Sequence, residues 1–194
     1  MNPDEMIAAA CALVAQRRAG RERVFVAIDG CGGAGKSTLA HGIQNSIAGV
    51  SIVCTDDFFR PLSQHRPRTL TPAKAYELYF PWERMRDEAL APLGNGETAR
   101  YQRHDWTTDA AGEWMIVEPN PIVIVEGVYS SRPELRELLD GIIFIDAPRE
   151  VRRRRMLARG PHDSAWMTPW MAAEDWYLEH IRPQESADLV LTSV

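Results

Sequence analysis

Residues 30–37 read Gly-Cys-Gly-Gly-Ala-Gly-Lys-Ser, which has the G-x-x-x-x-G-K-S spacing of a phosphate-binding loop. Glycines at these positions let the backbone curl so that its N–H groups point at phosphate oxygens, and the positive end of a following helix strengthens the attraction. Lys36 is expected to neutralise the β and γ phosphates, and the Ser37 hydroxyl is expected to bind Mg²⁺. The run therefore predicts a site for a nucleoside triphosphate with Mg²⁺. The residues expected to hold the nucleotide are Gly30, Cys31, Gly32, Gly33, Ala34, Gly35, Lys36, Ser37 and Thr38.

Carboxylates follow two of the apolar runs that could form strands. Asp56 and Asp57 come directly after the run 51–55, and Glu126 ends another such run. Open α/β sheets bind ligands at the carboxyl ends of their strands, so we expect these side chains beside the phosphate loop. Asp56 could then accept the proton of an attacking hydroxyl, and Glu126 could hold Mg²⁺ opposite Ser37. A turn-forming Asp pair and a helix-capping glutamate are the plainer alternatives.

Arginines recur along the predicted helix 148–159 at spacings that place four of them on about one helical face. Arg152 or Arg155 could clamp a phosphoryl group as charge moves during its transfer. A solvated face paired with nearby acids is an equally open interpretation. RNA binding is disfavoured, because the chain is acidic overall and no aromatic residues are interleaved with these arginines. The four residues are Arg149, Arg152, Arg155 and Arg159.

The composition favours an ordinary single-domain protein over several other classes. The chain has 194 residues, with 22 Lys and Arg against 27 Asp and Glu, which argues against a dedicated nucleic-acid binder. Its apolar runs are far shorter than the roughly 20 residues of a membrane span, and acidic residues near the start do not suit a signal peptide. The three cysteines, at 11, 31 and 54, fit neither a zinc pair nor a disulfide framework. We therefore expect a cytoplasmic protein without a membrane or nucleic-acid partner.

The elements that must position these groups follow from short apolar runs that alternate with helical stretches. Each run is rich in β-branched residues, as is typical of strands buried on both faces of a parallel sheet. We expect an α/β fold with a five-stranded parallel sheet, helices on both faces and a lid. The expected strands are 24–29, 51–55, 122–126, 142–146 and 189–192. A helix is expected over 3–18, and helical stretches or long crossovers are expected at 36–48, 72–93, 133–139 and 148–159.

Two stretches, 94–121 and 160–170, show no clear period and contain Gly, Pro and aromatic residues. We interpret them as substrate-covering parts of a single domain spanning 1–194, within insertions at about 60–118 and 155–175. Closure over 160–170 would exclude water from the site and so limit wasteful hydrolysis of the nucleotide.

With these pieces in order, the chain resembles the uridine kinase and phosphoribulokinase-like group of P-loop kinases over nearly its full length. The shared features are the phosphate loop, Asp-Asp-Phe-Phe at 56–59, Val-Glu-Gly-Val at 125–128, Ile-Asp at 145–146 with the arginines after it, and Ala-Asp-Leu-Val at 187–190. The resemblance implies a P-loop kinase that uses ATP and Mg²⁺. It also implies roles for particular residues: Asp56 as general base, Lys36 on the phosphates, Ser37 and Glu126 at the metal, and Arg152 or Arg155 near the transferred group.

The acceptor side departs from the uridine kinase pattern. Uridine kinases carry a carboxylate for the ribose where residues 79–82 read Tyr-Phe-Pro-Trp. They read the pyrimidine with a Tyr-Asp-Phe run and a later His, where residues 101–106 read Tyr-Gln-Arg-His-Asp-Trp. The tryptophans at 82 and 106 could equally pack under a lid, because aromatic side chains often serve burial. The residues expected to contact the acceptor are Asp57, Phe59, Tyr101, Arg103, His104, Trp106 and Glu126.

We expect an ATP-dependent phosphotransferase that acts on a hydroxyl of a small molecule, with a nucleoside such as uridine or cytidine as the first candidate. The altered pyrimidine positions leave a sugar, a vitamin precursor or an aminoglycoside-like compound open as acceptor. A regulator that binds ATP without transferring phosphate is a third hypothesis, and the carboxylates at 56 and 126 count against it. The sequence leaves homo-oligomer formation open.

Overall fold

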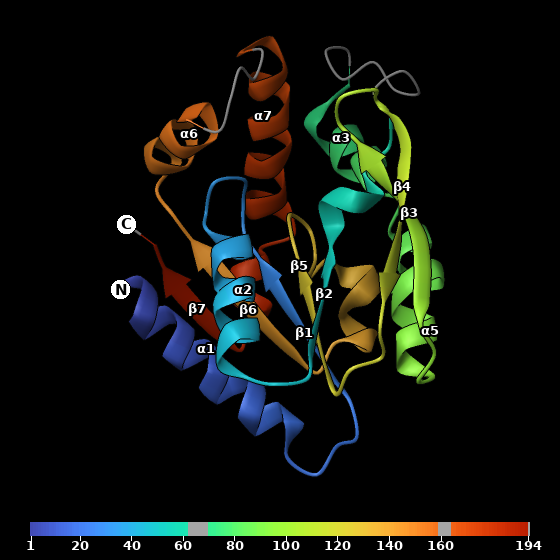
Figure 1. Cartoon of the computed structure of the whole chain (residues 1–194). Coiled ribbons are helices and arrows are strands. Elements are labelled where there is room, and N and C mark those ends of the chain that lie inside the picture. The colour runs from blue at the N-terminus through green and yellow to red at the C-terminus, as the bar shows by residue number, and fades with distance from the viewer. Residues whose placement is uncertain (62–69, 159–163, 194) are drawn as a thin grey trace.

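A five-stranded parallel sheet in the order β2-β5-β1-β6-β7 forms the centre of the computed structural model (Figure 1). The structure describes residues 1–61, 70–158 and 164–193. All five predicted strands are present, with bounds that differ from expectation by a residue at most, and the predicted fold class is confirmed. The strands are β1 (Val24–Asp29), β2 (Val50–Cys54), β5 (Ile122–Glu126), β6 (Gly141–Asp146) and β7 (Leu189–Thr192).

Helices cover both faces of this sheet because alternate residues of each strand point to opposite sides. Val24, Val26 and Ile28 of β1 pack in one cluster with α1 (Pro3–Arg18) and α2 (Lys36–Ser46). The side chain of Asn2 accepts a hydrogen bond from the backbone of Glu5, which begins α1 at the predicted proline. This cluster fixes the helix that follows the phosphate loop against the centre of the sheet.

The opposite face is covered by short helical segments, and here the expected helical stretch 72–93 is divided into two parts. The helix α3 (Pro72–Tyr79) ends before Pro81, because a proline disfavours helical geometry in the residue that precedes it. A second helical stretch then packs Met85, Leu90 and Leu93 against the sheet. It consists of α4 (Trp82–Met85), the π-helical turn η4 (Arg86–Leu90) and α5 (Ala91–Gly94). The stretch expected as helix 133–139 is the 3₁₀ helix η5 (Pro133–Leu138).

The stretch 94–121 is not irregular, as its sequence suggested, but contains a β-hairpin. Its strands are β3 (Ala99–Asp105) and β4 (Ala110–Val117), paired antiparallel with a register shift between Gln102 and His104. The shift interrupts the alternation of buried and exposed residues along β3, so the period-2 pattern of a strand is weak in the sequence.

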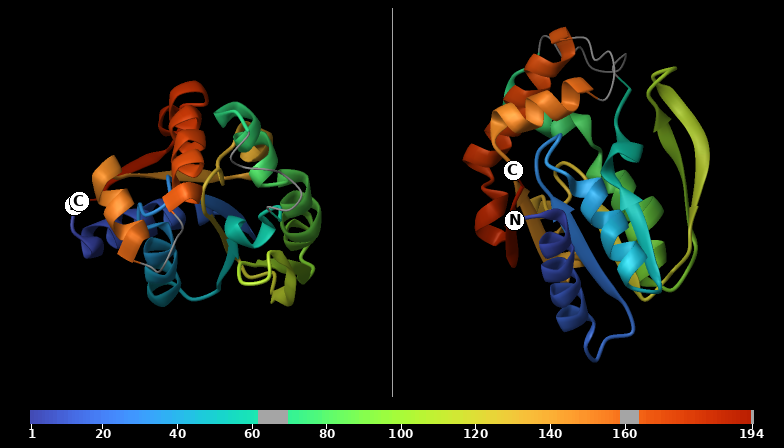
Figure 2. Two further views of the ribbon diagram at one scale, coloured as in Figure 1. Left: turned by 90° about the horizontal axis from the view of Figure 1, so that it is seen from above. Right: turned by 60° about the vertical axis from the view of Figure 1, so that its left-hand side comes forward.

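A third group of elements lies above the carboxyl ends of the strands. The helix α7 (Ser164–His180) lies beside α3 (Figure 2). The two helices share a cluster of buried aromatic residues. The prediction of an irregular 160–170 was wrong for 164–170, which begins α7; residues 160–163 lie outside the described part. The predicted arginine helix is present as α6 (Arg149–Ala158), and the 3₁₀ helix η6 (Pro183–Ser186) precedes β7. Among the described residues, no helix combines the length and apolar character needed to span a membrane.

Candidate active site

The loop between β1 and α2 curls through three glycines with positive φ, namely Gly30 at +144°, Gly33 at +78° and Gly35 at +107°. Gly35 is the N-cap of α2, and no side chain caps that helix, so its first amides are directed at the space in front of the loop. Position 33 has no room for a side chain, because a Cβ there would lie 2.6 Å from the backbone oxygen of Arg152. This backbone is the shape that polyphosphate binding requires.

Lys36 lies almost fully buried at the start of α2, and its ammonium Nζ donates a hydrogen bond to the backbone oxygen of Cys31, 3.0 Å away. The bond holds the positive charge against the curled backbone, where phosphate oxygens would lie. The Cys31 thiol is buried, and burial raises its pKa far above the ordinary value. Cys31 therefore contributes its backbone to the loop, and its thiol stays protonated.

Ser37 and Glu126 bring two oxygen ligands together beside this loop. The Ser37 hydroxyl donates to Glu126 Oε1 at 3.1 Å, and the Cys54 thiol donates to the same oxygen at 3.2 Å. Among the described residues there is no cluster of three His, Cys, Asp or Glu side chains that would hold a metal alone. Mg²⁺ commonly takes one or two protein oxygens and completes its shell with substrate phosphates and water, so the pair fits a Mg²⁺ that arrives with a triphosphate.

Asp56 stands at the end of β2, in the 3₁₀ turn η1 (Thr55–Phe58), with its side chain exposed to the cleft. The protein around the carboxyl group removes part of its hydration, and this desolvation is the main reason that the pKa of Asp56 rises to about 6. The positive charge of Lys36 acts to lower the pKa, and the negative charges of Glu126 and Asp57 act to raise it. A carboxylate with such a pKa can accept a proton near neutral pH and release it again. The strand order places this group beside Glu126, because β2 and β5 are neighbours with Cys54 opposite Glu126.

Asp57 points to the hairpin, where the Tyr101 hydroxyl donates a hydrogen bond to its Oδ2 at 3.2 Å. Burial raises the pKa of Asp57, while this hydrogen bond and the charge of Arg103 act to lower it. Tyr101 is buried and packs on Phe58, with ring centroids 4.5 Å apart. Arg103 forms an ion pair with Glu113 at 2.9 Å on the exposed face of the hairpin. Asp57 and Tyr101 therefore form a polar edge of the cleft, and Arg103 lies at its rim.

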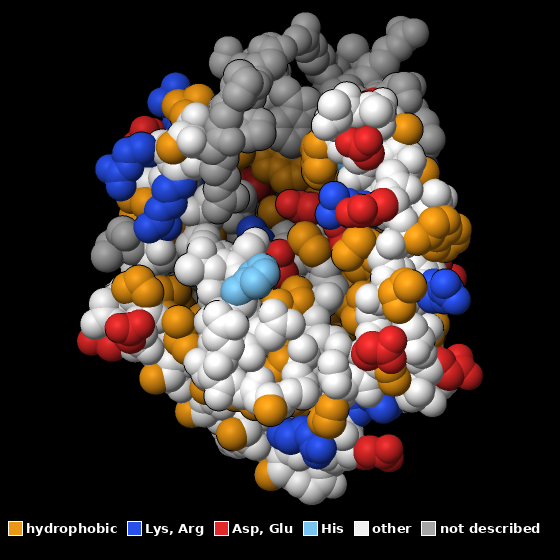
Figure 3. Space-filling model, viewed as in Figure 1, with side chains coloured by type: hydrophobic (Ala, Val, Ile, Leu, Met, Phe, Trp, Pro, Cys, Tyr) orange, Lys and Arg blue, Asp and Glu red, His pale blue; other side chains and the backbone are white. Residues whose placement is uncertain are grey.

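An aromatic wall, formed by Phe59, His104, Trp106 and Trp170, continues from this edge. Phe59 stacks on Trp106 with centroids 4.7 Å apart and also contacts His104 and Trp170. Trp106 is 52% exposed, whereas the His104 ring is buried and burial lowers its pKa. Trp82, by contrast, packs with the cluster under the sheet. Figure 3 shows the cleft between the two sides of the molecule, with acidic and hydrophobic side chains inside it.

The candidate arginines of α6 lie at different places around the phosphate loop. The buried Arg152 side chain donates to the backbone oxygen of Ala147 from Nε, at 3.1 Å. Arg155 instead donates from Nη1 to Ser193 Oγ at 2.9 Å and to the backbone oxygen of Gly33 at 3.3 Å. Arg149 pairs with Asp175 at the surface. Arg159 lies outside the described residues.

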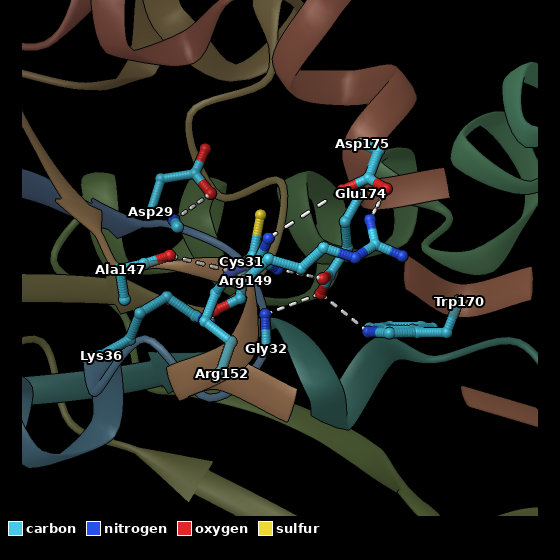
Figure 4. A network of polar contacts seen from close by, with 11 residues as sticks. Asp29, Cys31, Gly32, Lys36, Ala147, Arg149, Arg152, Trp170, Glu174 and Asp175 are labelled. Atoms are coloured by element: carbon cyan, nitrogen blue, oxygen red, sulfur yellow. Dashed lines mark hydrogen bonds and ion pairs between the residues drawn. The ribbon is translucent and has the colours of Figure 1, made fainter. Parts of the chain in front are cut away.

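Glu174 is a residue of the site that the sequence did not single out. Its carboxylate is fully buried and accepts hydrogen bonds from the Gly32 backbone, the Trp170 indole and Arg152 (Figure 4). Burial raises the pKa of Glu174, while the Gly32 amide and the charges of Lys36 and Arg152 act to lower it. A helical period over 170–177 could have placed Trp170, Glu174 and Tyr177 on one buried face.

Asp29, the last residue of β1, is a second buried carboxylate that sequence reasoning passed over. It accepts hydrogen bonds from the backbone of Gly30 at 2.6 Å, and of Tyr129 and Ser131 at 3.1 Å each. Two hydroxyls also donate to it, those of Ser131 at 2.5 Å and Tyr177 at 2.6 Å. Asp29 thus ties the start of the phosphate loop to the segment after β5 and to α7.

A pocket of about 370 Å³ opens beside the phosphate loop, on the side away from the aromatic wall. Arg155 and Ser193 supply polar groups to it, and Pro3, Met6 and Ile7 of α1 supply apolar ones. The size and the mixed lining suit the base and sugar of a nucleotide whose phosphates lie in the loop. The full lining is Pro3, Met6, Ile7, Gly33, Ala34, Gly35, Thr38, Leu39, Arg155, Ala158 and Ser193.

Comparisons with a family model and with individual proteins point to the same family. Residues 25–194 match the family model described as phosphoribulokinase / uridine kinase. A uridine kinase from Alkaliphilus metalliredigens is 30% identical over 144 residues, covering 70% of this chain and 67% of that protein. A uridine kinase from Deinococcus deserti is 28% identical over 170 residues, covering 84% of this chain and 81% of that protein.

Solved structures show the same fold. A structure described as a possible uridine kinase from Bacillus stearothermophilus superposes with a TM-score of 0.79 at 22% identity, covering 98% of this chain and all of that one. A protein assigned as a fructose transport system kinase, from a Silicibacter species, superposes with a TM-score of 0.68 at 27% identity, covering 97% and 98% of the two chains.

Proposed function

The chain belongs to the phosphoribulokinase/uridine kinase family of kinases, and from this premise we propose that it transfers the γ-phosphoryl group of ATP to a hydroxyl of a small molecule, with a nucleoside as the first acceptor class. One observation carries the proposal. Asp56, a carboxylate with a pKa of about 6, stands in the same cleft as the Lys36 ammonium and the Ser37–Glu126 pair. A proton acceptor, a phosphate-binding cation and a pair of metal ligands are the parts that phosphoryl transfer needs.

On the donor side, different residues bind different parts of the nucleotide. The curled backbone of 30–37 and the first amides of α2 hold the phosphates, and Lys36 neutralises their charge. Ser37 and Glu126 would hold the Mg²⁺, which when bound would screen the phosphate charge. Arg155 lies on the side of the pocket proposed for the base and sugar. Arg152 lies against the loop at Gly33 and is proposed to meet the transferred group.

On the acceptor side, Asp56 takes the proton of the attacking hydroxyl. A bond forms between the hydroxyl oxygen and the γ-phosphorus, the bond from that phosphorus to the bridging oxygen of ADP breaks, and the leaving ADP keeps the electron pair. Asp57, held by Tyr101, is placed to accept a hydrogen bond from a second hydroxyl of the acceptor. The exposed ring of Trp106, stacked on Phe59, offers a surface for a flat base.

A sugar is the second candidate acceptor, and one observation favours it. The stretch where uridine kinases carry a carboxylate for the ribose reads Tyr-Phe-Pro-Trp at 79–82, and the Phe80 side chain is buried with Phe59 and Tyr129. The chain also resembles a protein assigned as a fructose transport system kinase. A sugar would rely on Asp56, Asp57 and the aromatic wall without needing a base-reading group. We place either reaction in the cytoplasm, where ATP and free thiols coexist.

The decisive experiment is an acceptor screen with the purified chain, ATP and Mg²⁺, in which ADP release is measured and each product is identified by mass. Uridine or cytidine should raise ADP release well above the rate with water alone, and sugars, vitamin precursors and aminoglycosides form the comparison set. Lys36→Ala should abolish the signal while its circular dichroism stays that of the unaltered protein. Tight ATP binding without turnover on any acceptor would favour a nucleotide-binding regulator, and absence of ATP binding would refute the proposal.

A further inference from the structure

The buried carboxylate of Glu174 has no part in the reaction steps proposed above, yet it lies against the phosphate loop. Its Oε1 accepts from the Gly32 backbone N–H at 2.6 Å and from Trp170 Nε1 at 2.7 Å. Its Oε2 accepts from Arg152 Nη1 at 2.9 Å. Figure 4 shows this side chain reaching from α7 to the loop and to the arginine. One carboxylate thus joins three separate segments of the chain.

Glu174 lies so close to the loop that any side chain at position 32 would be crowded. A Cβ at position 32 would lie 3.1 Å from Glu174 Oε1 and 3.2 Å from the sulfur of Met156. Glycine therefore lets α6 and α7 approach the third residue of the loop directly. The loop is held from above by these two helices as well as from below by the sheet.

The Arg152 guanidinium is held at two points by this arrangement. Its Nε donates to the backbone oxygen of Ala147, and its Nη1 donates to Glu174, while Nη2 lies 3.9 Å from Asp175. The side chain of Arg152 is 5% exposed and that of Glu174 is fully buried. A planar guanidinium fixed along two edges keeps its remaining N–H groups in one direction. Without the Glu174 carboxylate, the buried positive charge would keep only the more distant Asp175 carboxylate, and its orientation would no longer be set.

We propose that Glu174 is a positioning residue that acts through Arg152, fixing the guanidinium and the Gly32 backbone to each other so that the arginine and the phosphate loop keep their places around the phosphoryl group during transfer. The proposal rests on the proposed function. A carboxylate suits this role better than a neutral group, because charge-assisted hydrogen bonds to arginine are shorter and stronger than neutral ones. Trp170 adds a link to the acceptor side, since the same ring that donates to Glu174 packs in the aromatic wall.

The test compares Glu174→Gln with Glu179→Gln. Both substitutions remove one negative charge from α7, but Glu179 is exposed and takes no part in the contacts of Arg152 described above. Glu174→Gln should lower kcat roughly a hundredfold, the usual effect of a small misplacement of a group that binds the transition state. The KM for ATP should stay within about threefold, because the base pocket and Lys36 are unchanged. Glu179→Gln should keep both constants.

Calorimetry supplies a readout that does not depend on turnover. The unaltered protein should bind ADP with aluminium fluoride and Mg²⁺, a mimic of the transferring phosphoryl group, much more tightly than ADP alone. Glu174→Gln should bind ADP alone as well as the unaltered protein does. Its affinity for the mimic should be at least tenfold lower than that of the unaltered protein. Arg152→Lys, which keeps the buried charge, should show the same pattern, and the double variant should lose no more than either single one.

The possible outcomes distinguish failure of the positioning role from failure of the proposed function. A kcat within twofold of the unaltered value in Glu174→Gln, or additive losses in the double variant, would overturn the positioning role. Should Glu174→Gln not fold, the Arg152→Lys arm decides, and an unchanged affinity for the mimic there overturns the proposal. An unaltered protein that binds the mimic no better than ADP would instead show that the proposed function is wrong.

Discussion

The Ser37 hydroxyl donates to Glu126 Oε1 across 3.1 Å and so joins the start of α2 to the end of β5. The two residues are 89 positions apart in the chain. Parallel pairing of β1 with β5 brings them together, because it sets Ile28, two residues before the phosphate loop, opposite Glu126. The pairing register of β1 and β5 therefore brings the two proposed metal ligands together.

Replacing Glu126 with Gln should weaken the response to Mg²⁺. The amide keeps the volume but loses the charge that a hard cation favours, so the Mg²⁺ concentration for half-maximal turnover should rise by about tenfold or more. Titrations of activity with Mg²⁺ at fixed ATP measure this. Glu77→Gln serves as the control, since Glu77 pairs with Lys74 on the exposed surface. An unchanged Mg²⁺ dependence in Glu126→Gln would remove this residue from the metal site.

Asp56→Asn should lose turnover while keeping its affinity for ATP. A missing general base costs on the order of 100-fold or more in rate. The base works in its deprotonated form, so activity of the unaltered protein should rise with pH through about 6 and then level off, following the pKa of Asp56. The residual activity of the variant should lack that rise. Asp57→Asn offers a contrast, because it should raise the KM of the acceptor and keep the pH profile.

Gly33→Ala should destabilise the protein more than Gly20→Ala does. The two glycines have nearly the same φ, +78° and +75°, so the cost of placing alanine in the left-handed region, about 1 kcal/mol, is shared. A Cβ at 20 meets nothing within 4 Å, whereas a Cβ at 33 would collide with the Arg152 backbone. Urea unfolding curves of both variants isolate the collision. Equal free energies of unfolding would show that α6 does not press on the loop.

Tyr177→Phe should lower stability by about 1–3 kcal/mol, because it removes the hydroxyl that donates to buried Asp29 at 2.6 Å. Tyr129→Phe is a matched control. Its hydroxyl is also buried but has no hydrogen-bond partner among the described residues, so its removal should be nearly neutral or slightly stabilising. Thermal unfolding followed by circular dichroism compares the pair. A loss as large in Tyr129→Phe would contradict the assigned role of Asp29.

Local patterns predicted the central sheet because each strand is a short apolar run with a polar residue at its exit. Val24–Asp29 and Ile122–Glu126 have their predicted bounds for this reason. The hairpin and α7 escaped prediction for different causes. The shift between Gln102 and His104 breaks the alternation of β3, and the aromatic residues and Pro169 at the start of α7 hide its helical period.

The candidate site was predictable only where a residue sits at a strand end or in a motif of known spacing. Asp56, Glu126 and Lys36 meet those conditions, and the structure brings them into one cleft. Glu174 and Asp29 do not, since their importance depends on which segments fold over them. For the same reason, the sequence could not show which groups the arginines of α6 contact. Spacing placed Arg152 and Arg155 on one helical face, yet one lies against Glu174 and the other against Ser193.

Pro3 and Ser193 line one pocket, so the two ends of the described chain meet beside the proposed base site. The Met1 ammonium donates to the backbone oxygen of Thr192, which holds the ends together. Any affinity tag or fusion partner joined at either end would start at the rim of that pocket and compete with the nucleotide for space. Purification handles are better inserted in the exposed turn 19–22 between α1 and β1, and donor affinities from end-tagged protein should be remeasured after the tag is cleaved.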